Sequence, residues 1–273
     1  LTELLAASGY GDVVSLIRKL AEDKKLEFTE SAMYHALLPF LNEREIERQI
    51  VKNHAVNRRH FGSIYAPKCL FPPEMAYAGK IAKVAARLGY PVIMLDEISY
   101  PKNGSREEWS KQVFPIHGAK NITAVFRERQ ISNLMMSSLA RDERTFHEAL
   151  GGSLAENQYL LTAMDGETFG HHRPGLEELL FAIMSVKNPE QIFVSEIPER
   201  YPRSETSIVP REATWAATEK DIERGVQFFS WKDPKNRVHV LQWRFFSFLR
   251  QKFAELKSVA AVAEDAYDLA SPR

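Results

Sequence analysis

The stretch that decides the fold reads YLLTAMDGETFGHH and runs from Tyr159 to His172. Its first six residues are apolar or nearly so, which is typical of a strand buried on both faces of a parallel sheet. Asp165 follows at once, and Gly166 and Gly170 let the chain turn without a Cβ clash. Parallel α/β proteins carry their chemistry at the carboxyl ends of strands, so this order predicts a functional site. The simpler interpretation is an Asp-Gly turn in a surface loop.

Strands and helices alternate along most of the chain. Strands are predicted at residues 26–29, 90–95, 122–126, 159–164 and 191–195. Apolar residues recur at helical spacing in the segments 12–20, 42–51, 74–88, 131–139, 144–150 and 176–183. Such alternation favours right-handed crossovers and a mostly parallel sheet. The predicted fold class is therefore α/β.

The pattern becomes purely helical from about Asp233. Helical spacing is kept by Val238, Leu241, Phe245, Phe248, Phe253 and Leu256. We interpret residues 233–273 as a helical C-terminal section that packs on the rest, with Trp243 in the core, and residues 1–232 as the main domain.

Composition excludes several classes of protein. The chain has 273 residues, of which 44% are hydrophobic and 26% charged, as expected of a globular protein. Basic and acidic residues number 36 each, so no global field attracts nucleic acid or an anionic membrane. No apolar run approaches the roughly 20 residues that span a bilayer. Cys69 is the single cysteine, which excludes an internal disulfide and favours a cytoplasmic setting.

Glu74 is the first candidate catalytic residue. It follows Pro72 and Pro73, and the proline pair predicts that Glu74 lies in the first turn of the next helix. The partial positive charge of a helix N-terminus favours an ionised carboxylate, and a rigidly held carboxylate suits a nucleophile. The competing interpretation is a glutamate that only satisfies the helix dipole.

Asp165 is the second candidate, because it ends an apolar strand. Apolar surroundings and a neighbouring carboxylate raise the pKa of a carboxylic acid, so that it can donate a proton near neutral pH. One charged and one protonated carboxylate is the division of labour in glycoside hydrolysis. Glu167 is predicted to tune this site or to bind substrate hydroxyls, or else to face solvent.

Four further residues are candidates for the site. Asp96 ends the strand at 90–95, and Arg127 and Arg129 follow the strand at 122–126. The arginines could orient carboxylates or sugar hydroxyls, but a structural ion pair explains them equally well. Trp215 could stack on a sugar ring or simply pack.

His171 and His172 raise the possibility of a metal site. With Asp165 they could form a hydrolase site of the polysaccharide-deacetylase kind. Against this, no His-x-x-x-His pair occurs among the eight histidines, and adjacent histidines on an extended chain point in opposite directions. The prediction is therefore that no metal and no cofactor is bound.

Three stretches resemble motifs of family 57 of the glycoside hydrolases. LEFTESA (Leu26–Ala32), with Tyr34-His35 behind it, resembles the second motif. CLFPPEMAY (Cys69–Tyr77) resembles the third, and TAMDGETFGH (Thr162–His171) resembles the fourth. They occur in the family's order.

The resemblance implies an incomplete (β/α)7 barrel that acts on α-glucans by a retaining mechanism. It implies that Glu74 is the nucleophile and Asp165 the general acid and base. The second motif places its glutamate at Glu27, and Phe71 stands where many members carry a tryptophan. The residues predicted to bind substrate are Glu27, Phe71, Asp96, Arg127, Arg129, Glu167, His171, His172 and Trp215.

The family's first motif, His-Gln-Pro, is absent, so we expect that the chain is truncated before its first barrel strand. The expected partner is an oligo- or polysaccharide, with no nucleic acid and no membrane, and the oligomeric state is undefined. Hydrolysis, transglycosylation and branching share one intermediate and stay open. A non-catalytic carbohydrate-binding relative and a metal-dependent polysaccharide deacetylase are the competing functional hypotheses.

Overall fold

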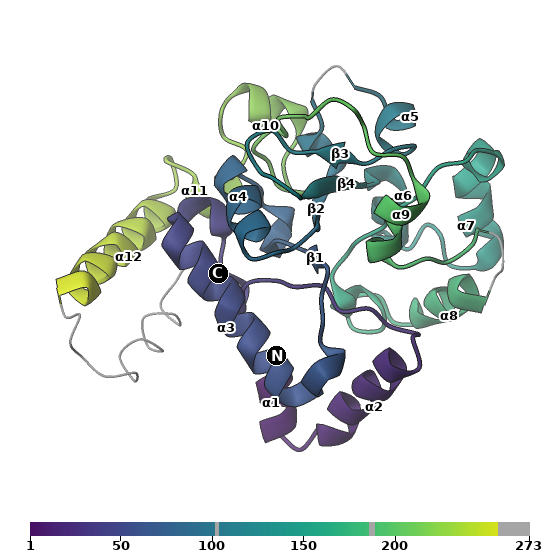
Figure 1. Cartoon of the computed structure of the whole chain (residues 1–273), viewed down its shortest axis with the longest axis horizontal. Helices are drawn as coiled ribbons and strands as arrows, with labels where there is room; N and C mark the ends of the chain where they lie inside the picture. The colour runs from purple at the N-terminus through teal and green to yellow at the C-terminus, as the bar shows by residue number, and fades with distance from the viewer. Residues whose placement is uncertain (102–103, 186–188, 256–273) are drawn as a thin grey trace.

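A small, mostly parallel sheet forms the centre of the molecule (Figure 1). The computed structural model describes residues 1–101, 104–185 and 189–255. The strand order is β1-β2-β4-β3. Strands β1 (Cys69–Leu70), β2 (Val92–Asp96) and β4 (Thr123–Arg127) are parallel, and β3 (Phe114–Pro115) pairs antiparallel with β4. The predicted α/β class with a mostly parallel sheet is confirmed.

The two central strands follow from their sequences. Every residue of VIMLD in β2 and of TAVFR in β4 is buried, as expected for strands covered on both faces. Their register pairs Asp96 with Arg127, which brings two charged side chains together at the carboxyl ends. The strands predicted at 90–95 and 122–126 are therefore confirmed to within two residues, whereas β1 lies in a segment without a predicted strand.

The other three predicted strands are wrong as regular strands. Segment 26–29 forms no strand, and a single parallel bridge joins the next residue, Glu30, to Leu70; segment 159–164 is reduced to a single parallel bridge of Leu161 with Arg127. Segment 191–195 instead runs into a 3-10 turn, η8 (Val194–Glu196). In segment 159–164, hydrogen bonds with side chains stand where a regular strand would have ladder hydrogen bonds. The Ala163 N–H donates to the Ser132 hydroxyl, and the Ala163 carbonyl accepts from Arg127.

Helices surround the sheet, with α3 and α4 to its left in Figure 1 and α6, α7 and α8 to its right. Their bounds are α1 (Thr2–Ala7), α2 (Gly11–Glu22), α3 (Glu43–Phe61), α4 (Gly79–Arg87), α5 (Arg106–Trp109), α6 (Arg129–Met136), α7 (Glu143–Leu150), α8 (Glu177–Ser185), α9 (Ile197–Arg200), α10 (Glu219–Glu223), α11 (Phe229–Lys232) and α12 (Arg237–Glu255). The predicted start of α3 is confirmed, since the Asn42 side chain accepts the Glu45 N–H at 2.9 Å.

Glu30 is a fully buried carboxylate between the sheet and α3. Its two oxygens lie 2.6–3.1 Å from side-chain donors, which are Asn53 Nδ2, His54 Nδ1, Tyr65 Oη and Tyr90 Oη. A buried charge is tolerated only when its lone pairs are satisfied. Glu30 therefore ties α3 to the segments that precede β1 and β2.

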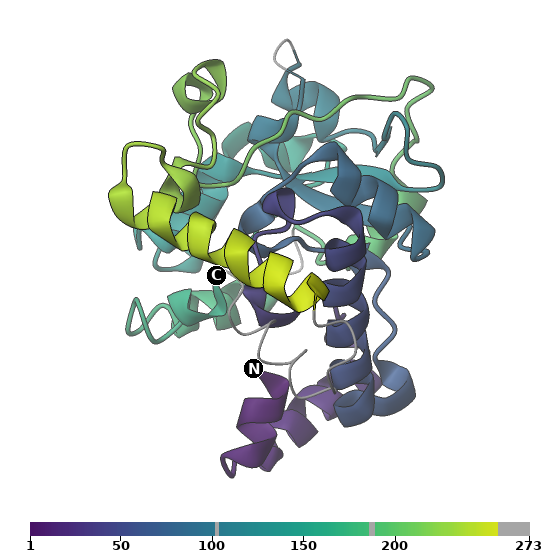
Figure 2. The same cartoon turned by 90° about the vertical axis from the view of Figure 1, so that its left-hand side faces the viewer.

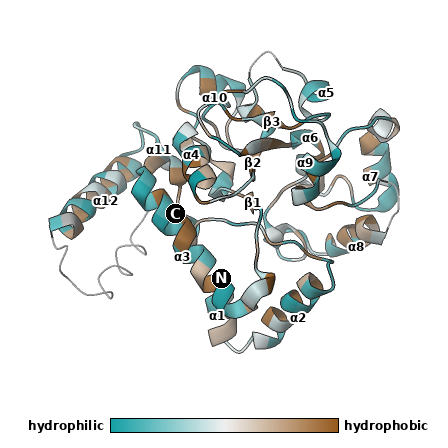
Figure 3. Ribbon diagram, viewed as in Figure 1, coloured by the Kyte–Doolittle hydropathy of each residue, from teal (hydrophilic) through white to brown (hydrophobic). Residues whose placement is uncertain are grey.

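Helix α12 crosses the face of the molecule seen in Figure 2 and extends to one side in Figure 1. Only part of its apolar side packs inward, because Val238, Leu241, Phe245 and Phe248 are 52–62% exposed. Figure 3 shows hydrophobic and hydrophilic residues interspersed along the ribbon of α12. Only Phe246 of this helix is fully packed among the described residues. Leu256 lies outside the described residues.

Contacts cross the predicted boundary at residue 232. The Trp243 indole donates to the Trp231 carbonyl at 2.8 Å, and its ring meets Phe40 at 4.8 Å. Trp243 is thus part-buried against the main body. The division into residues 1–232 and 233–273 stays a proposal. Within the described ranges, no helix is both long and apolar enough to cross a bilayer.

Candidate active site

Glu74 lies in a strained turn directly after β1. The turn is the 3-10 segment η4 (Pro73–Met75), in which Glu74 has φ 59° and Met75 has φ 45°. Such left-handed backbone at residues other than glycine costs on the order of 1–3 kcal/mol and persists only where neighbours hold it. Here the Glu74 carbonyl accepts the Thr214 hydroxyl at 2.6 Å and the Trp215 backbone N–H at 3.3 Å.

The prediction that Glu74 opens a helix is therefore wrong. Helix α4 begins at Gly79, because residues with positive φ cannot be part of a right-handed helix. The dipole of α4 acts only within the first turn of that helix, so it is not the cause of the ionisation of Glu74. Hydrogen bonds from other side chains favour the ionised form instead.

Both oxygens of the Glu74 carboxylate have a partner. His35 Nε2 lies 3.0 Å from Oε1, and the Trp215 indole N–H donates to Oε2 at 2.8 Å. The hydrogen bond from His35 is the main cause that lowers the pKa of Glu74, and the bond from Trp215 lowers it further against the opposing effect of burial. The side chain is still 25% exposed, so Glu74 is an ionised carboxylate that a ligand can reach.

Asp165 has the opposite electrostatic character. It follows the segment 159–164 and precedes the 3-10 turn η7 (Gly166–Thr168), with its side chain open to solvent on one side. Neighbouring protein atoms raise the pKa of Asp165 by desolvation, and the charges of Glu74 and Glu167 raise it further. Because such effects require proximity, the fold brings Glu74 and Asp165 to one site.

His35 is the residue of this site to which the sequence pattern gave no role. It lies in the 3-10 turn η1 (Met33–His35), and its side chain is 54% exposed. The hydrogen bond to Glu74 raises the pKa of His35, and the charges of Asp165 and Glu167 act in the same direction. The one sequence signal was its position just behind the stretch that resembles the second motif.

Glu167, His171 and His172 form the exposed rim beside Asp165. The His172 N–H donates to the Glu167 carbonyl at 2.8 Å, and the two histidine rings lie 5.0 Å apart. The charge of His172 lowers the pKa of Asp165, opposite to the effect of Glu167. Their predicted binding of substrate stays a prediction.

Asp96, Arg127 and Arg129 form an ion-pair cluster beneath the site. Arg127 Nη1 lies 2.9 Å from Asp96 Oδ2, and Arg129 Nε lies 2.8 Å from Asp96 Oδ1. Asp96 and Arg127 are buried, whereas Arg129 is part-exposed. The arginines thus form the structural ion pair that their sequence positions also allow. Direct substrate contact by Asp96 and Arg127 stays a prediction, and this arrangement does not favour it.

The aromatic candidates Phe71 and Trp215 lie next to Glu74, whereas Glu27 contacts a different segment. The half-buried rings of Phe71 and Trp215 meet edge to face at 6.2 Å. Glu27 instead accepts the backbone N–H of Ser195 at 3.2 Å, which ties segment 26–29 to η8. Stacking on a sugar by Phe71 or Trp215, and substrate binding by Glu27, stay predictions.

The histidine pair does not join a metal cluster. No group of three or more His, Cys, Asp and Glu side chains within the described ranges is arranged to hold an ion. The deacetylase hypothesis therefore gains no support from this part of the chain.

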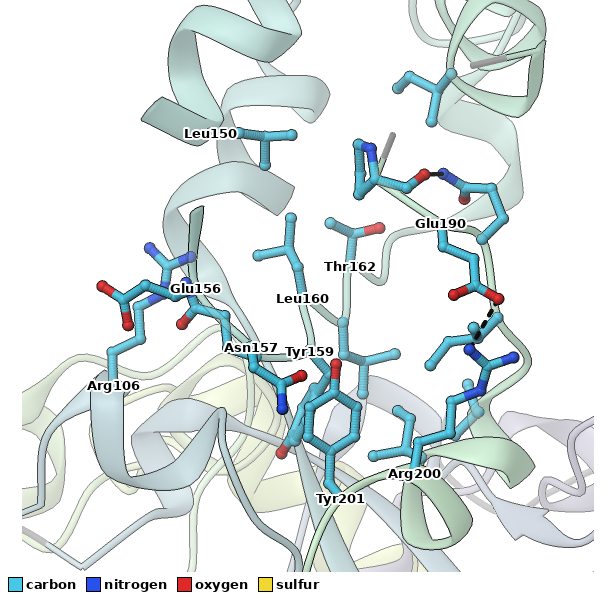
Figure 4. A pocket seen from close by; sticks show the side chains of 18 of the residues that line it. Arg106, Leu150, Glu156, Asn157, Tyr159, Leu160, Thr162, Glu190, Arg200 and Tyr201 are labelled. Carbon is cyan, nitrogen blue, oxygen red and sulfur yellow. Dashed lines mark hydrogen bonds and ion pairs between the residues drawn. The ribbon is translucent and has the colours of Figure 1, made fainter. Parts of the chain in front are cut away.

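A separate cavity of about 310 Å³ lies between α7, segment 156–162 and segment 189–201 (Figure 4). Tyr159 and Tyr201 lie in it, and an ion pair of 2.8 Å between Glu190 and Arg200 lies at its edge. Neither candidate catalytic carboxylate lines it.

The chain belongs to glycosyl hydrolase family 57, since the sequence signature of that family matches residues 5–199. No curated protein sequence matches the chain significantly.

Solved structures show the same fold. A GH57-type branching enzyme from Pyrococcus horikoshii has a TM-score of 0.68 at 15% identity, covering 96% of this chain and 60% of its own. A GH57 branching enzyme from Thermococcus kodakaraensis has 0.65 at 16%, covering 97% and 62%. A 4-alpha-glucanotransferase from Thermococcus litoralis has 0.60 at 18%, covering 90% and 36%. The chain thus spans between about a third and two thirds of the length of these relatives.

Proposed function

We propose that this chain is the catalytic portion of an α-glucan-active enzyme that cleaves or transfers glycosidic linkages with retention of configuration. The observation that carries the proposal is that the pKa values of two carboxyl groups, which act on each other by their charges, are shifted in opposite directions. Hydrogen bonds lower the pKa of Glu74, whereas desolvation and the Glu74 charge raise the pKa of Asp165. This is the pairing that a retaining glycosidase needs.

Each carboxyl group has one task in the proposed reaction. Glu74 attacks the anomeric carbon while Asp165 gives its proton to the departing glycosidic oxygen, so that one C–O bond forms as another breaks. Asp165, now ionised, removes a proton from water or a sugar hydroxyl. That oxygen attacks the anomeric carbon, and the Glu74 ester bond breaks.

Membership of family 57 and the named activities of the branching enzymes and the glucanotransferase support α-glucan as the substrate class. The bridges at Glu30 and Leu161, which extend the parallel pairing to both sides of β1, β2 and β4, support an incomplete (β/α)7 barrel.

The test uses alanine variants of both carboxylates, an aryl α-maltooligosaccharide and azide. Glu74→Ala and Asp165→Ala should each lower turnover of maltoheptaose more than about 1,000-fold. Azide should rescue Glu74→Ala with formation of a β-glycosyl azide, because the nucleophile's face is empty. It should rescue Asp165→Ala with formation of the α-glycosyl azide, because the covalent intermediate still forms.

Glu190→Gln at the separate cavity is the control and should leave turnover unchanged. Wild-type activity in Glu74→Ala would refute the assignment. Binding of maltoheptaose by calorimetry without any turnover would favour a non-catalytic carbohydrate-binding protein. Addition of glucose as an acceptor distinguishes hydrolysis from transfer by the products formed.

A further inference from the structure

On the basis of the proposed function, we infer that Arg127 is a positioning residue that sets the relative placement of Glu74 and Asp165. It acts on Glu74 through the Trp215 ring and on Asp165 through the Ala163 backbone. Arg127 is 1% exposed, and in this role its influence on the site passes through the neighbours that it contacts.

The first arm of this arrangement leads to Glu74. The Arg127 guanidinium carbon lies 5.6 Å from the centre of the Trp215 ring, within the range of a cation–π contact. The indole N–H on the same ring donates to Glu74 Oε2 at 2.8 Å. Arg129 holds the Trp215 carbonyl at 2.5 Å, so ring and backbone are both fixed.

The backbone around Trp215 clamps the strained turn as well. Ala213, Thr214 and Trp215 each provide a backbone or hydroxyl group to the segment from Glu74 to Tyr77. The Tyr77 N–H, for example, donates to the Ala213 carbonyl at 2.8 Å. A displacement of Trp215 would therefore move the whole turn.

The second arm leads to Asp165. Arg127 Nε donates to the Ala163 carbonyl at 2.7 Å, two residues before Asp165. The Ala163 N–H donates to the buried Ser132 hydroxyl at 3.3 Å. Both backbone polar groups of Ala163 are thus held from the β4–α6 region, although segment 159–164 has no regular strand partner.

The guanidinium group itself is fixed from two sides. Its Nη1 lies 2.9 Å from Asp96 Oδ2, and its Nη2 donates to Asn133 Oδ1 at 3.1 Å. A planar fork with several donors and a flat face can make all these contacts at once, whereas a lysine ammonium cannot. The side chain therefore suits a positioning role that the conservative replacement would lose.

Arg127→Lys and Trp215→Phe test the inference. Retaining chemistry needs the carboxyl groups about 5–5.5 Å apart, and an error of about 1 Å can cost roughly 100-fold in rate. Arg127→Lys should lower kcat by about 100-fold while KM changes less than about threefold. Trp215→Phe keeps an aromatic ring but removes the indole N–H donor, and should lower kcat by roughly 10- to 100-fold.

The pH profile separates positioning of Glu74 from a general structural defect. Trp215 lowers the pKa of Glu74, so Trp215→Phe should move the acid limb of kcat/KM to higher pH. Trp243→Phe is the matched control, since it also loses one indole hydrogen bond, which in this case goes from α12 to the Trp231 carbonyl. Arg211→Lys is the control for the arginine, because Arg211 likewise donates to backbone carbonyls and a carboxylate.

The outcomes also separate this inference from the proposed function. If Glu74→Ala abolishes activity but both positioning variants keep wild-type kcat and acid limb, the inference is refuted and the proposed function stands. If the wild type is inactive, the proposed function fails. Crystal structures of the wild type and Trp215→Phe then decide the geometric part: a Glu74 to Asp165 separation unchanged within error would refute it, and a shift would support it.

Discussion

His35 acts on both candidate carboxylates, whereas His172 acts on one. Removal of the His35 imidazole should raise the pKa of Glu74, because its main hydrogen bond is lost, and should also raise the pKa of Asp165, because a nearby positive charge is lost. Activity falls as pH drops through the pKa of Glu74 and as pH rises through that of Asp165. His35→Asn should therefore move both limbs of the kcat/KM profile to higher pH.

His172→Asn is the matched comparison, since the charge of His172 lowers the pKa of Asp165 but is not a cause of the shift at Glu74. This variant should move the alkaline limb upward and leave the acid limb in place. A common shift of both limbs in both variants would contradict the assignment of Glu74 to the acid limb.

At the scale of the residue, the sequence marked two candidate carboxylates but did not predict the contacts of Glu74. Glu74 and Asp165 could be selected because proline, glycine and apolar neighbours mark their positions in the chain. The contacts of His35 and Trp215 with Glu74 depend on a left-handed turn and on a distant segment, and neither has a local signal. A helix dipole was accordingly the wrong cause for the ionisation of Glu74, although the direction of the pKa shift was right.

At the scale of secondary-structure elements, the Glu30 cluster should account for much of the attachment of α3. Glu30→Ala removes the carboxylate that four side-chain donors surround, and it deprives the buried residues Tyr65 and Tyr90 of this acceptor. We expect a loss of roughly 3–5 kcal/mol in the free energy of unfolding, measured by urea denaturation.

Glu43→Ala is the control for Glu30. Glu43 is the first residue of α3 and pairs with Arg87 at 2.7 Å, but its side chain is 45% exposed. Exposed ion pairs contribute about 0–1 kcal/mol. Equal losses in the two variants would show that burial does not distinguish them and would contradict the role given to Glu30.

The strands illustrate which elements could be predicted from the sequence. Strands β2 and β4 are continuous apolar runs, and runs of that kind have no stable place other than the middle of the sheet. Segment 159–164 is similarly apolar, yet it forms only a single bridge with β4, and the polar groups of Ala163 bind the side chains of Arg127 and Ser132. The composition of a segment predicts how deeply it is buried, but it does not predict which groups form hydrogen bonds with its backbone.

At the scale of the whole molecule, the candidate site depends on segments from most of the chain. His35, Glu74, Asp165 and Trp215 come from four separate turns, and the buried Arg127 lies between the last two segments. The family signature ends at residue 199, before Trp215. The part beyond that signature thus supplies a hydrogen bond to the proposed nucleophile.

Two adjacent phenylalanines on α12 give a prediction about the stability of the whole molecule. Phe246 is 3% exposed and its ring meets Trp243 at 5.7 Å, whereas Phe245 is 62% exposed. Truncation of a buried phenylalanine leaves a cavity and costs roughly 3–5 kcal/mol, while an exposed site usually changes by less than about 0.5 kcal/mol. Phe246→Ala should therefore lower the urea midpoint strongly and Phe245→Ala should not. A comparable loss in Phe245→Ala would mean that the exposed stripe of α12 is covered in solution.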